Sequence, residues 1–393
     1  MVQMRHPWPA CALALAGALV WGGLTAHADD RQGNDDQGRK RAVFVIAMEN
    51  HNWTQPAGTT PPQPIFMNPD APFINSLVNG TSGISDQVAY ATNYINAGVG
   101  IHPSEPNYIW AEAGQNFGVF NDDTPFHADC TPDTVQTTDQ HLTAFLTKAH
   151  RSWTSYQEDT DVDLTTNAPL PPSAWTVPLF NLSGAFTAGG LNAYNYSTQF
   201  NYAAKHNPMV FFTDTSGGCD KTPSNPLRTH YAPLQQLALD LQTGDLADYI
   251  WITPNQYNDM HTTLTNGYGG AVGAPEKGDA GRIAQGDNFL ARLVPLIMAS
   301  DAYKHRGIIV LWWDESEGGD SPSFTLPFIV ISTDAHENVG GKPFASGGQY
   351  SHSSFLRTMQ EIFGVDPDNG FPFLGAAANA ADLSALFRPG TVK

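Results

Sequence analysis

The chain has few basic residues for its length. Only 19 Lys and Arg stand against 38 Asp and Glu in 393 residues, which gives a formal net charge of −19. A surface this acidic argues against nucleic-acid binding and against docking on an anionic membrane, because both partners are polyanions. An anionic substrate would therefore need local positive charge at its site, and a bound cation is the simplest source of that charge.

The chain also lacks an apolar run long enough to favour a membrane span. Its apolar N-terminal stretch, residues 10–24, is too short and too interrupted by glycine. With Arg5 before it and an Ala-His-Ala triplet ending at Ala28, it predicts a secretory signal over residues 1–28. An uncleaved anchor is the alternative. We therefore expect an exported protein, periplasmic or secreted, without a stable membrane anchor.

Internal repeats, heptads and a long dividing linker are absent as well. Residues 29–40 are polar and poor in apolar side chains, so we expect a disordered lead-in there. The remaining residues, 41–393, are then expected to form a single domain, a length within reach of a large α/β enzyme.

Cysteine is scarce, with three residues in the whole chain. Cys11 would leave with the signal, so the mature chain would hold only Cys130 and Cys219. In an exported protein such a pair predicts one disulfide. Two free buried thiols are the alternative.

Two apolar runs each end in a pair of metal-ligand-type side chains. Residues 43–48 are followed at once by Glu49-Asn50, and residues 307–313 by Asp314-Glu315. Short, β-branched runs unbroken by charge predict buried strands of a parallel sheet. The ligand site of an open α/β sheet lies beyond the carboxyl ends of its strands. The two pairs are therefore expected to deliver four oxygen ligands to one edge, as a hard cation requires.

Further apolar segments along the chain alternate between strand-like and helical spacing. This alternation indicates an α/β fold with a largely parallel central sheet flanked by helices. Compact apolar runs predict strands at 209–212, 249–253 and 327–332. Helical spacing predicts helices at 141–149, 228–243, 288–299 and 354–363, the last ended by Gly364. Stretches rich in Pro, Asn and Thr predict long surface loops at 54–72 and 159–200, of which the second is expected to cap the site.

Each acidic pair has an ordinary structural alternative. Asn50 is suited to cap the N-terminus of a helix. Asp314-Glu315 could begin a solvated acidic loop, since Glu317 and Asp320 follow closely. Adjacent carboxylates at a buried edge repel one another, however, unless a cation or an arginine neutralises them. Considered together, the two pairs favour a site for one divalent metal ion.

A third segment, residues 102–108, places a serine between two prolines. Pro103 and Pro106 stiffen the backbone around Ser104 and so direct its hydroxyl. A serine beside a divalent cation can act as a nucleophile without a histidine base, because the metal stabilises the alkoxide. Asn107 could donate a hydrogen bond to a developing oxyanion. An ordinary proline-braced turn would show the same pattern.

Histidines lie next to two other predicted elements. Asp259 and His261 follow a predicted strand, and His352 precedes a predicted helix. An Asp and two His could form a second cation site, or act as acid and base on a leaving group. A hydrogen-bonded loop histidine is the alternative for each ring. His206 is a weaker candidate of the same kind.

In this order, the motifs resemble the bacterial phosphoesterase family that contains acid phosphatases and phosphatidylcholine-type phospholipases C, within the alkaline phosphatase-like superfamily. The resemblance reaches from residue 42 to the C-terminal region, and the set is specific although each member alone is not. Its main segments are residues 44–51, 102–108, 253–261, 313–315 and 350–354. It implies an alkaline phosphatase-like fold and the hydrolysis of phosphate esters.

The resemblance also implies roles for individual residues. One divalent metal ion would be held by Glu49, Asn50, Asp314 and Glu315. Ser104 would be the nucleophile, through a phosphoserine that water then hydrolyses. The positions where two-metal relatives bind a second cation, and where single-metal relatives contact phosphate or the leaving group, match Asp259, His261 and His352. One or two metal ions are therefore expected, and both roles of the second pocket stay open.

One departure from the family pattern bears on the substrate. The phospholipase branch usually has an Asp-His pair after its Asp-Glu motif, whereas residues 317–321 contain no His here. This favours the phosphatase-like branch. We therefore expect an exported, metal-dependent hydrolase of small phosphate monoesters. A phospholipase C-type phosphodiesterase and a non-catalytic secreted binding module on the same fold are the alternatives.

Overall fold

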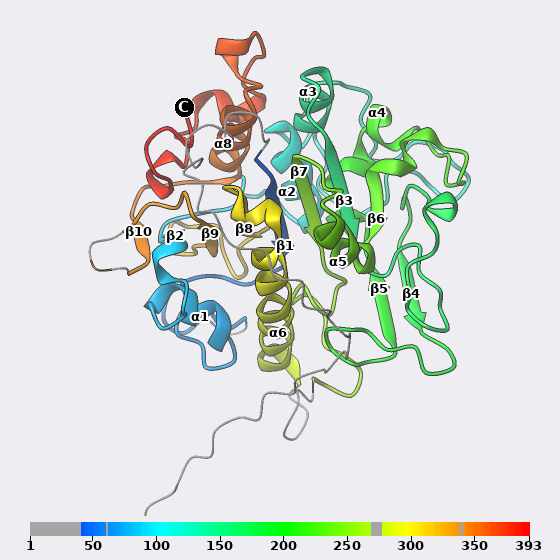
Figure 1. The fold of residues 1–393 in the computed structure, drawn as a ribbon, viewed down its shortest axis with the longest axis horizontal. Helices are drawn as coiled ribbons and strands as arrows, with labels where there is room; N and C mark the ends of the chain where they lie inside the picture. The colour runs from blue at the N-terminus through cyan, green and yellow to red at the C-terminus, as the bar shows by residue number, and fades with distance from the viewer. Residues whose placement is uncertain (1–40, 60–61, 269–276, 338–339, 341) are drawn as a thin grey trace, which may run out of the picture. The chain divides into compact units, whose positions relative to one another are not determined.

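The centre of the fold is an eight-stranded sheet with strand order β10-β2-β9-β8-β1-β7-β3-β6 (Figure 1). The computed structural model describes residues 41–59, 62–268, 277–337, 340 and 342–393. The strands of this sheet are β1 (Val43–Met48), β2 (Val88–Ala91), β3 (Trp153–Gln157), β6 (Tyr231–Pro233), β7 (Tyr249–Thr253), β8 (Ile308–Trp313), β9 (Phe328–Ser332) and β10 (Phe344–Ser346).

Parallel pairing dominates the sheet. β1 runs parallel to β7 and to β8, and β3 continues the parallel order beyond β7. Among the described strands of this sheet only β9 runs opposite, since it pairs antiparallel with both β8 and β2. Every residue of β1, β7 and β8 is buried, as expected for strands that are covered on both faces. The predicted α/β fold with a largely parallel sheet is confirmed.

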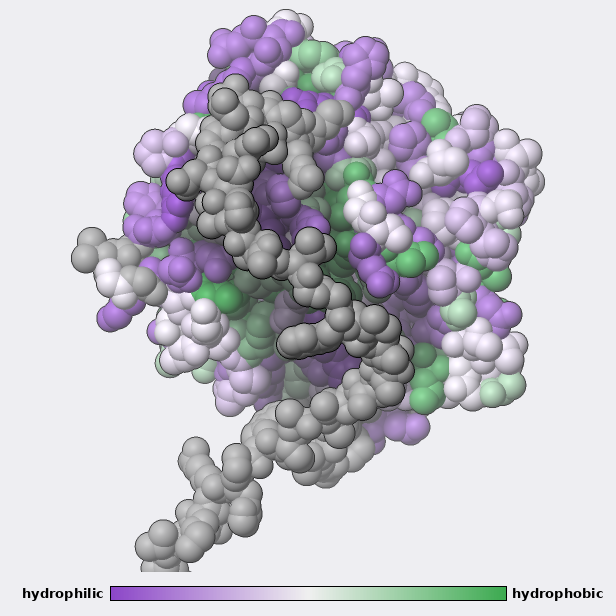
Figure 2. Space-filling view, in the orientation of Figure 1, coloured by the Kyte–Doolittle hydropathy of each residue, from purple (hydrophilic) through white to green (hydrophobic). Residues whose placement is uncertain are grey.

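Helices lie on both sides of the sheet (Figure 1). The described α-helices are α1 (Pro72–Asn79), α2 (Ser104–Ala113), α3 (Leu142–Lys148), α4 (Thr213–Ser216), α5 (Leu234–Thr243), α6 (Gly278–Ala299), α7 (Asp301–Lys304) and α8 (His352–Phe363). α1 packs against α6, whereas α2 packs against α3 and α8. In the face that Figure 2 presents, hydrophobic residues form scattered patches among hydrophilic ones.

Short 3-10 helices connect many of these elements. They are η1 (Ser85–Gln87), η2 (Pro172–Ala174), η3 (Ala204–His206), η4 (Pro208–Phe211), η5 (Pro226–His230), η6 (Pro367–Asn369), η7 (Gly375–Asn379) and η8 (Ser384–Leu386). A separate antiparallel pair is formed by β4 (Leu182–Ala185) and β5 (Gln199–Tyr202).

Three predicted segments differ in the structure. Residues 209–212 were expected as a strand but lie mainly in η4, whose side chains are buried against α2. The expected helix at 228–243 is divided into η5, β6 and α5, because Pro233 has no N–H for a helix interior. The expected loop at 159–200 contains β4, so part of it is a β-hairpin.

The remaining predicted elements are confirmed. The strands at 249–253 and 327–332 correspond to β7 and β9, and the helix at 141–149 to α3. The helix at 288–299 is the second half of α6, which begins earlier. α8 ends at Gly364, whose positive φ of 66° suits glycine. The loop at 54–72 is irregular in its described residues until α1 begins.

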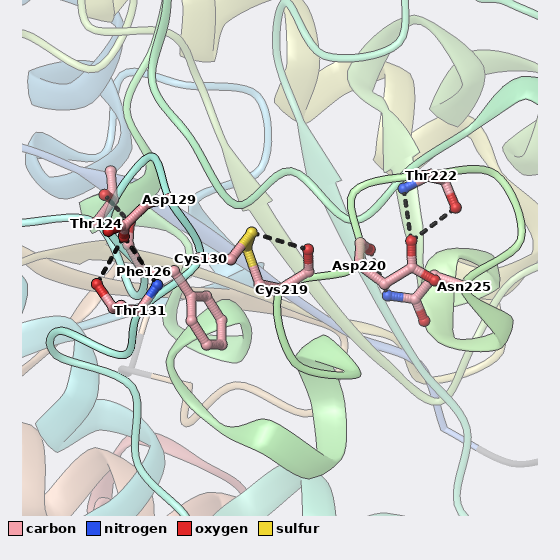
Figure 3. Close-up of a disulfide and its surroundings, with 9 residues drawn as sticks. All are labelled: Thr124, Phe126, Asp129, Cys130, Thr131, Cys219, Asp220, Thr222 and Asn225. Carbon is pink, nitrogen blue, oxygen red and sulfur yellow. Dashed lines mark hydrogen bonds between the residues drawn. A yellow bond between two sulfur atoms is a disulfide. The ribbon is translucent and has the colours of Figure 1, made fainter.

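Cys130 and Cys219 form a disulfide between two loops that lie 89 residues apart in sequence (Figure 3). The predicted disulfide is therefore confirmed over two free thiols. The predicted signal and lead-in, residues 1–28 and 29–40, lie outside the described residues and stay predictions. Within the part of the chain that the structure describes, no helix is both long and apolar enough to cross a bilayer.

Candidate active site

Two polar pairs meet where β1 and β8 end. Met48 and Trp313 are neighbours in the sheet register, so Glu49 and Asp314 follow them side by side. The Asn50 N–H donates to Asp314 Oδ1 at 3.0 Å, and the Asp314 N–H donates to the Met48 carbonyl at 3.2 Å. Asn50 has a positive φ of 45°, which asparagine tolerates better than most residues. Parallel pairing thus brings the two predicted acidic segments together.

Ser104 lies between these two pairs. It is the first residue of α2 and is 1% exposed. Its Oγ donates to Glu49 Oε2 at 3.1 Å and lies 3.4 Å from Glu315 Oε1. One terminal atom of the Asn50 amide lies 3.2 and 3.3 Å from the same two carboxylate oxygens. Polar groups from three elements therefore converge within hydrogen-bonding distance of one another.

The spacing of these groups fits the ligands of a divalent cation. Neighbouring oxygens around an octahedral Mg²⁺ are about 3 Å apart, since each lies about 2.1 Å from the metal. The distances of 3.1 and 3.4 Å from Ser104 Oγ to the two glutamates are close to that value. Asp314 Oδ2 is buried without a hydrogen-bond partner, which fits an oxygen placed for a ligand.

The carboxyl groups at this edge are buried close together, an arrangement that a bound cation would stabilise. Burial, aided by the nearby charge of Asp314, raises the pKa of Glu49 well above its ordinary value. Burial and the adjacent Glu315 raise the pKa of Asp314 in the same way. Among the described residues, no three His, Cys, Asp or Glu side chains are already arranged as a metal's ligands. The candidate ligand group therefore depends on the oxygens of Asn50 and Ser104 as well as on carboxylates.

Tyr108 and His206 both contact Oε1 of Glu49. The Tyr108 hydroxyl donates to Glu49 Oε1 at 2.6 Å, and its ring stacks on His206 with centroids 5.1 Å apart. His206 Nε2 lies 3.2 Å from Glu49 Oε1 and Nδ1 lies 3.3 Å from Asp259 Oδ2, without hydrogen-bond geometry. Burial lowers the pKa of His206 well below its ordinary value, which favours the neutral ring. His206, the weaker of the predicted histidine candidates, thus lies between the carboxylates of Glu49 and Asp259.

Asp259 and His261 reach the same edge from the end of β7. The backbone carbonyl of Asp259 accepts a hydrogen bond from the Glu49 N–H at 2.8 Å. The side-chain Oδ1 of Asp259 accepts one from the His261 N–H, also at 2.8 Å. Asp259 Oδ2 has no hydrogen-bond partner and faces His206. The His261 ring is partly exposed, and its centroid lies 5.8 Å from that of His206. Burial lowers the pKa of His261 to about 4.

His352 lies on the buried side of Asp314. It is the first residue of α8 and is fully buried. Its Nε2 contacts the Asp314 carbonyl, and its Nδ1 lies 2.9 Å from the Tyr94 hydroxyl and 3.2 Å from Trp312 Nε1. Both ring nitrogens are therefore engaged within the protein. This geometry favours a role in positioning Asp314 over contact with a leaving group.

Asn107 is buried below Ser104 and braces the loop before α2. Its Nδ2 donates to the Ile101 carbonyl at 2.9 Å and to the Pro103 carbonyl at 3.3 Å. The same nitrogen lies 3.5 Å from Glu315 Oε2. The amide therefore helps to orient Glu315, and its predicted donation to an oxyanion stays a prediction.

His102 begins the segment 102–108 but is not among the predicted site residues. It contacts Glu315 through Nδ1 and lies 2.7 Å from Asp320 Oδ1 through Nε2. The hydrogen bond to Glu315 is the main cause that raises the pKa of His102 to about 9. Its position two residues before Ser104 was the available sequence signal.

Lys205 is a second unpredicted charge at the site. Its Nζ lies 2.7 Å from Asp122 Oδ2, and its side chain is 12% exposed. Burial alone would lower the pKa of Lys205, but the charges of Glu49 and Asp122 outweigh it and the pKa is raised. Sequence reasoning had no means to distinguish this partly buried lysine from a surface one.

The family model and the sequence relatives agree with these motifs. A family model described as "Phosphoesterase family" matches residues 49–366. The chain is 26% identical over 345 residues to Phosphatidylinositol-3-phosphatase from Mycobacterium tuberculosis, covering 88% of this chain and 83% of that protein. It is 25% identical over 294 residues to Phosphate-repressible acid phosphatase from Penicillium chrysogenum, covering 74% of this chain and 55% of that protein. A solved structure of a protein in the alkaline phosphatase superfamily from Vibrio parahaemolyticus has 11% identity and a TM-score of 0.41, covering 84% of this chain and 68% of that chain.

Proposed function

Since the chain belongs to the Phosphoesterase family and is a hydrolase of phosphate esters, we propose that it is an exported, metal-dependent phosphatase that acts on phosphate monoesters through Ser104. The observation that carries this proposal is the Ser104 hydroxyl, 3.1 Å from Glu49 and 3.4 Å from Glu315. A serine nucleophile needs an oriented oxygen next to a group that lowers its pKa, and a cation held by these carboxylates would be that group. A turn that was merely braced by prolines would not need two buried carboxylates around its serine.

The metal of this proposal would be held by Glu49, Asn50, Asp314 and Glu315, with Ser104 beside it. When bound, such an ion neutralises charge on the phosphate and stabilises the serine alkoxide. The donor set consists of oxygens, which suits Mg²⁺, Ca²⁺ or Mn²⁺. Buried carboxylates that lack such a counter-charge repel one another, so the ion would also stabilise the fold. Asp259 and its histidine neighbours are the candidates for a second ion.

The side chains have distinct tasks in the proposed reaction. The Ser104 oxygen forms a bond to phosphorus while the bond from phosphorus to the leaving oxygen breaks. With the ion bound, the Ser104 hydroxyl would lose its proton to water, because Glu49 Oε2, which now accepts its hydrogen bond, would face the ion. α2 begins at Ser104, so the positive end of its dipole faces the phosphate. His261, the partly exposed histidine, would give the leaving oxygen a proton at acidic pH, because its pKa of about 4 keeps the ring neutral at higher pH. A water oxygen then bonds to phosphorus, the bond from phosphorus to Ser104 Oγ breaks, inorganic phosphate leaves and Ser104 regains its proton.

The substrate class rests on the phosphatase branch of the family. The name of the mycobacterial relative denotes hydrolysis of a phosphate monoester on a lipid. This supports monoester hydrolysis and keeps lipid monoesters among the candidate substrates, whereas a phospholipase C would cleave a diester. The disulfide between Cys130 and Cys219 supports export, because disulfides persist in oxidising compartments.

One assay tests the proposal. Purified protein is given p-nitrophenyl phosphate, phosphatidylinositol 3-phosphate or phosphatidylcholine, with a divalent metal added. We expect turnover of at least one monoester and none of the diester. Ser104→Ala should lower that turnover by about 10³-fold or more, whereas Ser224→Ala, at an exposed serine, should not. Undiminished turnover in Ser104→Ala would refute the nucleophile, and preferred cleavage of phosphatidylcholine would refute the monoester assignment.

A further inference from the structure

A cavity lies on the side of the sheet where β3 and β7 begin. Its volume is about 550 Å³, a size typical of small-molecule sites. Ser152 and Trp153 line it at the start of β3, and Leu246 and Ala247 line it just before β7. The candidate active site lies past the other ends of these strands, where Asp259 follows β7. A five-residue strand such as β3 separates its two ends by roughly 13 Å.

Aromatic rings form the apolar part of this cavity. Trp153, Tyr156 and Trp175 line it together with His230. Trp153 stacks face to face on His230, with centroids 4.1 Å apart and planes 10° apart. Because His230 is partly exposed, this stack presents a flat ring surface at the cavity. Such surfaces bind flat apolar faces of a ligand.

Hydrogen-bond acceptors and a hydrogen-bond donor complete the lining of the cavity. Asp240 accepts from the Tyr156 hydroxyl at 2.6 Å and from Gln236 Nε2 at 2.7 Å. Asp245 adds a second, exposed carboxylate, and Arg228 adds a guanidinium. Carboxylates only accept, whereas guanidinium groups only donate. A ligand that both donates and accepts hydrogen bonds would find partners for each.

Arg228 also makes the cavity rigid before any ligand binds. Its Nε donates to the Pro223 carbonyl at 2.7 Å and its Nη1 to the Pro172 carbonyl at 2.6 Å. Pro172 belongs to the cavity wall, so Arg228 ties two loops together there. A preformed site loses less conformational entropy on binding.

We propose that this cavity binds a neutral, polyhydroxylated ring, such as one or two units of a saccharide. The C–H face of such a ring matches the His230 surface, and its hydroxyls both donate and accept, which matches Asp240 and Arg228. A phosphate or another anion is disfavoured by Asp240 and Asp245, and a simple cation by Arg228. The site is separate from the candidate active site, so an exported protein could hold a glycan there while hydrolysing phosphate esters at the other edge.

Sugar binding to the full chain tests this site. Glucose, galactose, mannose, N-acetylglucosamine and their disaccharides are added, and binding is followed by saturation-transfer NMR and tryptophan fluorescence. We expect at least one to bind. Asp245→Ala and Gln236→Ala should each weaken binding about fivefold to tenfold, the effect of one hydrogen bond. Thr229→Trp, at the exposed rim, should narrow the cavity and weaken binding.

Gln242→Ala is the matched control for Gln236→Ala, since Gln242 is an exposed residue of the same helix. It should leave sugar binding unchanged. Phosphate-ester turnover should stay unchanged in all these variants, so failure of one proposal is distinguishable from failure of the other. Tetramethylammonium and inorganic phosphate are titrated separately as a cation and an anion. The saccharide site is refuted if no sugar of the panel binds, if Thr229→Trp binds as the wild type does, or if only one of these two ions occupies the cavity.

Discussion

The Tyr108 hydroxyl donates a hydrogen bond of 2.6 Å to Glu49 Oε1, while Ser104, one helical turn earlier in α2, approaches Oε2 of the same carboxylate. One face of α2 thus holds both oxygens of Glu49. The spacing of four residues places the two side chains on the same side of the helix. The helix that carries the candidate nucleophile therefore also orients a candidate metal ligand.

Tyr108→Phe removes this hydrogen bond and keeps the aromatic stack on His206. We expect kcat to fall about tenfold, because groups that orient metal ligands typically contribute that much. Stability should fall by about 1–3 kcal/mol. Tyr202→Phe is the control, since its buried hydroxyl donates to the Pro178 carbonyl at 2.7 Å. Comparable loss of activity in both variants would show that Tyr108 acts on stability alone.

Asp314→Asn should separate metal binding from folding. We expect most turnover to be lost, because the substitution replaces a negatively charged candidate ligand of the metal by a neutral amide. A chelator should lower the melting temperature of the wild type, since a metal at 100 times its Kd stabilises by about 2.7 kcal/mol. It should change that of Asp314→Asn far less. Asp301→Asn, at a side chain that is 86% exposed, should behave as the wild type. Full activity of the metal-free wild type would contradict the metal site.

Asp287 should make stability depend on pH. It accepts hydrogen bonds from the Phe73 and Ile74 N–H groups at 3.0 and 2.8 Å, at the start of α1. Burial nevertheless raises its pKa from 3.8 to about 7. The folded chain therefore keeps a proton that the unfolded chain loses. The resulting stability is fully present below pH 3.8 and is lost as pH rises through about 7, on the order of 4 kcal/mol in total.

Urea unfolding of the wild type and of Asp287→Asn across this pH range isolates the effect. The variant has no titrating group at this position. As pH rises, the unfolding free energy of the wild type should therefore fall relative to that of the variant. Other carboxyl groups contribute equally to both proteins and cancel. A difference that is independent of pH would show that the Asp287 pKa is not raised.

The disulfide should contribute strongly to stability. It closes a loop with a sequence separation of 89 residues, and loop closure of that size restricts the unfolded chain by on the order of 4 kcal/mol. The double variant Cys130→Ala with Cys219→Ala should therefore unfold at lower temperature, as should the reduced wild type. Reductant should leave the double variant unchanged. An equal effect of reductant on both proteins would exclude the disulfide as its cause.

Local sequence was sufficient for the strands that carry the acidic pairs. Six consecutive apolar residues in β1 and six in β8 are all buried, and their ends carry Glu49 and Asp314. Burial on both faces demands an uninterrupted apolar run, so the pattern is visible without a structure. The same reasoning failed at η4, because a short buried apolar run is equally compatible with a helical turn.

The sequence did not show which distant side chains contact one another. His206 and Lys205 lie next to each other in η3, yet their positions beside Glu49 depend on how that segment packs against α2. His352 is a candidate acid by residue type, and only the structure shows that its ring nitrogens face Tyr94, Trp312 and the Asp314 carbonyl. Periodicity and residue type report on burial and on local conformation. Which polar atoms finally meet depends on strand order and helix packing, which are properties of the whole folded chain.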